Sequence, residues 1–123
     1  MKKTFVGIGF GPIQAGLFLH EAFSSGNFNR YVVAVVMPDV VAAVRHGGGK
    51  CRVNIATEKG IVPHVVSGLE IFNPNDESDR RILIRALAEA DEIATALPSV
   101  SFYKTGGVKS VAALLAEGLK ERL

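Results

Sequence analysis

Tryptophan is absent from this sequence, and Cys51 is its single cysteine. One cysteine cannot form an internal disulfide, so a disulfide framework is excluded and a reducing, cytoplasmic location is expected. An excess of charge of one sign is missing too, because 14 basic residues are balanced by 12 acidic ones. This balance does not predict a surface that binds nucleic acid.

A long uninterrupted apolar run is also missing. The most apolar stretch, residues 5–19, contains four glycines and Pro12, so it predicts neither a secretory signal nor a membrane-spanning helix. We therefore expect no membrane partner. What the chain does have is 123 residues, 48% of them apolar, which suits one compact domain with one core.

The order of predicted elements indicates an α/β fold. Apolar and β-branched runs predict strands at Thr4–Ile8 and at residues 31–36, 51–56, 65–72 and 93–97. Helical spacing predicts helices at residues 13–24, 39–46, 76–90 and 110–119, and in the first of them Ile13, Gly16, Leu17 and His20 share one face. This alternation predicts a mainly parallel sheet with helices on both faces, and a ligand site at the carboxyl ends of its strands.

A glycine-rich turn between the first strand and the first helix is the most informative segment. It has two possible registers as a G-x-G-x-x-G motif. In one, Gly7 and Gly9 lead and Pro12 takes the third place; in the other, Gly9 and Gly11 lead and Gln14 takes the third. We favour the second register, because it puts Pro12 in the first helical turn, where its missing N–H costs nothing.

In that register the turn is a candidate dinucleotide site. Gly11 would let a pyrophosphate approach the backbone, and the Ile13 and Gln14 amides would face the anion at the positive end of the helix. The simpler interpretation is a glycine-rich turn that binds nothing.

A dinucleotide site also needs a carboxylate after the second strand to hold the ribose hydroxyls. None of Val35, Val36 and Met37 is acidic. Asp39 is the nearest candidate, and it has an alternative role as a helix cap. No arginine stands there to hold a 2′-phosphate.

Several blocks in order resemble the N-terminal cofactor domain of mannitol-1-phosphate 5-dehydrogenase and related polyol dehydrogenases. The corresponding segments are residues 9–16, Arg45-His46, residues 51–55, Val66-Ser67-Gly68, residues 91–96 and residues 115–119. The chain departs from the family at Gln14, at Val35 and at Pro98, and by an insertion at residues 103–107.

The resemblance implies that residues 1–123 form a single Rossmann-like domain that binds NAD, with Thr95 and Ala96 near the nicotinamide. The predicted cofactor-binding residues are Gly9, Phe10, Gly11, Pro12, Ile13, Gln14, Asp39, Thr95 and Ala96. The family's catalytic lysine lies in a second, helical domain that these residues do not include. No catalytic residue is therefore assigned here, and the alternative is a non-catalytic nucleotide-binding or interaction module.

Two further expectations concern partners. Apolar residues around Leu97-Pro98 and Phe102-Tyr103 predict a surface for the missing domain or for a second copy of the chain. His20, His46 and His64 are far apart in the sequence, and Cys51 has no cysteine partner, so no metal site is expected.

Overall fold

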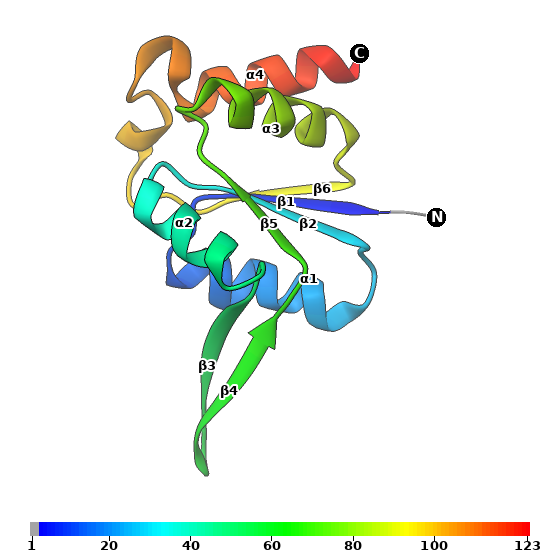
Figure 1. Ribbon diagram of the computed structural model, residues 1–123, viewed down its shortest axis with the longest axis vertical. Coiled ribbons are helices and arrows are strands. Elements are labelled where there is room, and N and C mark those ends of the chain that lie inside the picture. The colour runs from blue at the N-terminus through cyan, green and yellow to red at the C-terminus, as the bar shows by residue number, and fades with distance from the viewer. Residues whose placement is uncertain (1–2) are drawn as a thin grey trace.

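Four parallel strands form the middle layer of the computed structural model, which describes residues 3–123 (Figure 1). Their order across the sheet is β5 (Leu69–Phe72), β2 (Arg30–Ala34), β1 (Thr4–Ile8) and β6 (Glu92–Thr95). From β1 the chain moves outward through β2 to β5 and then returns to the other side of β1 to form β6. The strand order therefore reverses between β1 and β6. The predicted α/β class and parallel strand pairing are confirmed.

Helices cover both faces of this sheet (Figure 1). One face carries a π-helical segment (Gln14–Leu19), which continues as α1 (His20–Ser25), and α2 (Pro38–His46); the other carries α3 (Glu77–Glu89) and α4 (Val111–Arg122). Each face has its own apolar cluster, because side chains alternate along β1: Phe5 belongs to the α1 side and Val6 to the α3 side. None of the helices in residues 3–123 is long and apolar enough to cross a membrane.

The strand predicted at residues 65–72 is wrong, because it is two strands in two different sheets. The chain turns at Gly68, whose φ of +70° favours glycine, so β4 (Gly60–Val66) ends before β5 begins. β4 pairs antiparallel with β3 (Cys51–Thr57) to form a separate hairpin. Pro63 lies inside β4, and a proline within a run weakens the sequence signal for a strand.

The first helix buries only part of the face that its spacing predicts: His20 is buried and Gly16 is half-buried. Ile13 and Leu17 are 62% and 54% exposed, whereas Gln14 and Leu19 are fully buried. The π-helical winding from Gln14 to Leu19 has a wider turn than the α-helix and rotates each successive side chain by a smaller angle, which places Gln14 and Leu19, five residues apart, on one buried face.

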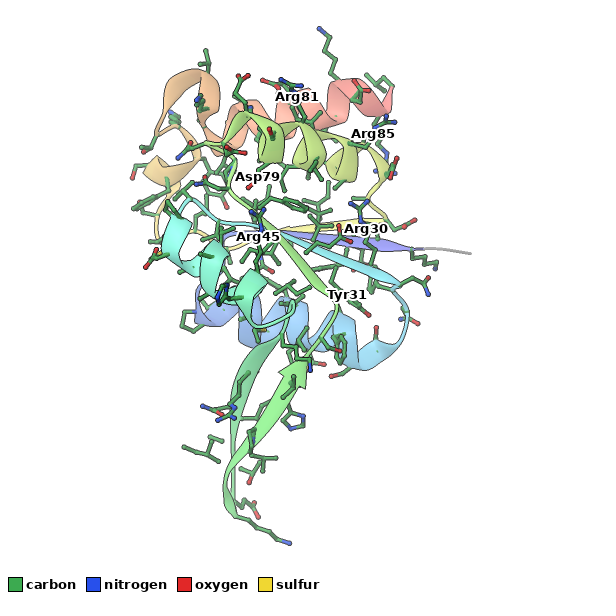
Figure 2. All side chains as sticks on the ribbon, viewed as in Figure 1. Arg30, Tyr31, Arg45, Asp79, Arg81 and Arg85 are labelled. Atoms are coloured by element: carbon green, nitrogen blue, oxygen red, sulfur yellow. The ribbon has the colours of Figure 1, made fainter. Side chains whose placement is uncertain are left out.

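An arginine connects the helices on the two faces of the sheet at its edge strand β5. Arg45 of α2 donates to the Ile71 carbonyl oxygen at 2.8 Å and to the Asp79 carboxylate of α3 at 3.0 Å (Figure 2). Its guanidinium also lies over the Phe72 ring. These contacts hold the start of α3 beside the carboxyl end of β5.

Candidate functional site

The glycine turn lies between the carboxyl ends of β2 and β6. The Gly9 N–H donates to the Ala34 carbonyl oxygen at 2.8 Å, and the Ala96 N–H donates to the Ile8 carbonyl oxygen at 2.9 Å. Gly9 has a φ of +92°, and a Cβ there would collide with the Ala96 carbonyl oxygen. The structure therefore brings Gly9 and Ala96 together at the point where strand order reverses.

The next part of the turn faces open space. A Cβ built on Gly11 would meet nothing within 4 Å, and the φ of Gly11 is not left-handed. The Ala15 N–H donates to the Gly11 carbonyl oxygen at 3.0 Å, so Pro12 stands in the first turn of the helix. Phe10 packs partly against the core on the α1 side. Gly7 lies inside β1, so the turn itself begins at Gly9.

Gln14 fills the place where the motif has its third glycine. Its side chain is fully buried, and its Nε2 donates to the Ile8 and Ala94 carbonyl oxygens at 3.1 and 2.9 Å. A Cβ on Gly7 would lie 2.8 Å from the Gln14 Cδ. The glycine that permits close packing of helix and strand is thus Gly7 on the strand, instead of a glycine on the helix. The side-chain amide of Gln14 bonds to both β1 and β6. The Gln14 Oε1 has no hydrogen-bond partner within the described structure.

Because glycine stands on the strand at position 7 and the side chain on the helix at position 14, we predict that substitutions at these two positions have coupled effects on stability. Gly7→Ala should destabilise the fold by about 1–3 kcal/mol through overpacking, and Gln14→Gly by about 2–4 kcal/mol through a cavity and two lost hydrogen bonds. The double variant restores the usual arrangement of a side chain on the strand and glycine on the helix. We expect the double variant to lose less free energy of unfolding, measured by urea denaturation, than the sum of the losses in the two single variants. Additive losses would contradict the exchange.

No carboxylate lies at the end of β2 in the described structure. Val35 is buried, Val36 and Met37 are about half exposed, and Asp39 is exposed in the first turn of α2. The expectation that Asp39 caps this helix is wrong, because the N-cap is Met37 and no side chain caps it. Asp39 lies one residue past Pro38, where its charge favours the helix dipole.

Thr95 is the last residue of β6 and Ala96 follows it, and a residue not predicted to belong to the site joins them. The Tyr103 hydroxyl lies 2.8 Å from the Thr95 Oγ1. Of the residues predicted to form an apolar surface, Pro98 and Phe102 are exposed, whereas Leu97 and Tyr103 are half-buried. The sequence signal for Tyr103 was weak, because it lies in the insertion at residues 103–107 and its contact with Thr95 depends on how that insertion folds.

Within residues 3–123 no three His, Cys, Asp or Glu side chains are grouped to hold a metal ion. Burial raises the pKa of the Cys51 thiol, which favours its neutral, less nucleophilic form. What the arrangement offers is an open glycine at the first turn of a helix, and the backbone N–H groups of a first helical turn can bind an anion.

Comparison of the chain with protein-family models and with curated proteins finds no match.

Proposed function

We propose that the chain is a Rossmann-like dinucleotide-binding domain that holds NAD across the turn from Gly9 to Gln14. The observation that carries this proposal is the position of the turn: it follows the central strand β1, at the reversal of strand order, and Gly11 leaves open space above its backbone. In open parallel sheets ligands bind outside the carboxyl ends of the strands at such a reversal.

The roles of the residues follow from their positions. The amides of Ile13 and Gln14, in the first turn of the helix, would donate to the pyrophosphate, and Gly11 would let it reach them. Thr95, at the end of β6, and Ala96, which follows it, would lie beside the nicotinamide. Tyr103 would hold the Thr95 hydroxyl in one orientation. NAD, when bound, supplies the acceptor for a hydride.

For the wider activity we propose a polyol-phosphate dehydrogenase similar to mannitol-1-phosphate 5-dehydrogenase, with the ordered sequence blocks as support. Hydride transfer would then need a second domain, because no general base is assigned in this one. A second candidate is a nucleotide-binding or interaction module without catalysis. It is favoured by one observation, that no carboxylate follows β2 to hold the ribose.

The missing carboxylate makes the proposal testable by cofactor preference. Because none of Val35, Val36 and Met37 puts a carboxylate directly after β2, no charge at that position repels a 2′-phosphate, so NAD and NADP should bind with similar, weak affinity. Val36→Asp should strengthen NAD binding on the order of tenfold, as expected for a charged hydrogen bond, and weaken NADP binding. Saturation-transfer NMR with each nucleotide measures this.

The matched control is Val36→Asn, which offers a hydrogen bond without a charge. It should leave NADP binding unchanged. If neither nucleotide binds the unmodified chain at millimolar concentration, the proposed function is wrong.

A further inference from the structure

The β3–β4 hairpin extends beyond α1 and ends in a projecting tip (Figure 1). At its base Val53 and Val66 are buried in the core on the α1 side. Toward the tip, Ile61 and Val62 are 71% and 41% exposed, and near the base Val65 is 54% exposed. A two-stranded ribbon is marginally stable by itself, and an open strand edge readily pairs with another strand.

The two edges of the hairpin differ. A two-residue turn joins the Thr57–Gly60 pair, and the closing pair of such a hairpin is hydrogen-bonded. Hydrogen-bonded pairs then alternate with non-hydrogen-bonded ones, so the backbone groups of the Asn54–Pro63 pair point outward. Pro63 has no N–H, which removes a donor from the edge of β4.

The edge of β3 carries no such block. Arg52, Asn54 and Ala56 are exposed, and their backbone N–H and carbonyl groups point away from β4 by the same alternation. Within residues 3–123 no third strand joins this sheet. β3 is therefore the edge at which another strand can pair.

The sequence of β3 is complementary to itself. Antiparallel pairing about a two-fold axis at Asn54 sets all seven residues of β3 opposite those of a second copy. Val53 then faces Ile55 of the second copy, on the side that packs against each body. Just outside the strand, Lys50 faces Glu58 of the second copy, and symmetry repeats this pair of opposite charges at the other end.

We propose that two copies of the chain associate through β3, forming one four-stranded antiparallel sheet in the order β4-β3-β3-β4. The base of one hairpin then lies beside the tip of the other, so the two bodies occupy opposite ends of the shared sheet. This interface is separate from the glycine turn and does not rest on the proposed function.

Disulfide cross-linking tests the register. Cys51 is the only cysteine, so a Cys51→Ser background has no other thiol. In that background, Asn54→Cys places two thiols opposite each other at the axis, at a Cα separation of about 5.5 Å that a disulfide tolerates. Mild oxidation should convert most of the protein to a covalent dimer.

Ile55→Cys in the same background is the register control. Its thiols lie two residues apart along the paired strands, so it should cross-link much less. Efficient cross-linking at Ile55 with none at Asn54 would overturn the proposal.

A pair of proline variants tests the edge. Asn54→Pro and Val65→Pro each remove one outward N–H, the first from β3 and the second from β4. Sedimentation velocity should show the unmodified chain as a dimer, with a dissociation constant raised on the order of tenfold or more by Asn54→Pro and unchanged by Val65→Pro. Circular dichroism checks that both variants fold. A strictly monomeric unmodified chain, or dissociation by Val65→Pro alone, would overturn the proposal.

Discussion

Gly11→Val should abolish NAD binding, with a loss of at least about 100-fold, while the fold remains intact. The side chain would fill the open space above Gly11, where the pyrophosphate must approach the backbone. The Cβ of that side chain meets nothing within 4 Å, and the φ of Gly11 is not left-handed, so the free energy of unfolding should change by less than about 1 kcal/mol. Titration calorimetry gives the affinity and urea denaturation gives the stability.

Asp39→Ala is the control for this result. Asp39 is exposed and makes no capping hydrogen bond, so its removal should cost only a favourable charge at the helix dipole, about 0.3–1 kcal/mol. NAD affinity should stay nearly unchanged. Equal NAD affinity in Gly11→Val and the unmodified chain would show that the nucleotide does not use the turn.

Gly9→Ala, unlike Gly11→Val, should greatly lower the free energy of unfolding. A left-handed backbone conformation costs an alanine about 1–2 kcal/mol, and the new Cβ would also collide with the Ala96 carbonyl oxygen. Overpacking of this kind typically adds about 1–3 kcal/mol. We therefore expect a total loss of about 3 kcal/mol or more in urea denaturation.

Gly26→Ala separates the two contributions to that loss. Gly26 also has a left-handed φ, +72°, but a Cβ there meets nothing within 4 Å. Its replacement should therefore cost only the conformational part, about 1–2 kcal/mol. Similar losses of stability in Gly9→Ala and Gly26→Ala would mean that Gly9 does not pack closely against the Ala96 carbonyl group.

The parallel core could be predicted because its signal is local. The β-branched run at residues 31–36 has no polar alternation, which is typical of a strand covered on both faces, and Val32 and Val33 are indeed fully buried in β2. The glycines and Pro12 likewise indicate a turn between the first strand and a helix without any knowledge of the tertiary structure.

The features that were not predicted depend on contacts between distant residues. The fit of Gln14 against Gly7 reverses the usual positions of side chain and glycine, and only packing reveals it. The bond between Thr95 and Tyr103 depends on the path of an insertion. The hairpin was not predicted in full, because Pro63 weakens the strand signal of β4 and because a turn at Gly68 divides residues 65–72 between two sheets.

The most direct test of the account is a ¹H–¹⁵N correlation spectrum of the labelled chain recorded during titration with NAD. The account predicts that the amides of Gly9, Gly11, Ile13 and Gln14 shift together with those of Thr95 and Ala96, and that amides at the hairpin tip do not. An absence of shifts at millimolar NAD, or shifts confined to another part of the molecule, would contradict the claim that this turn binds a dinucleotide.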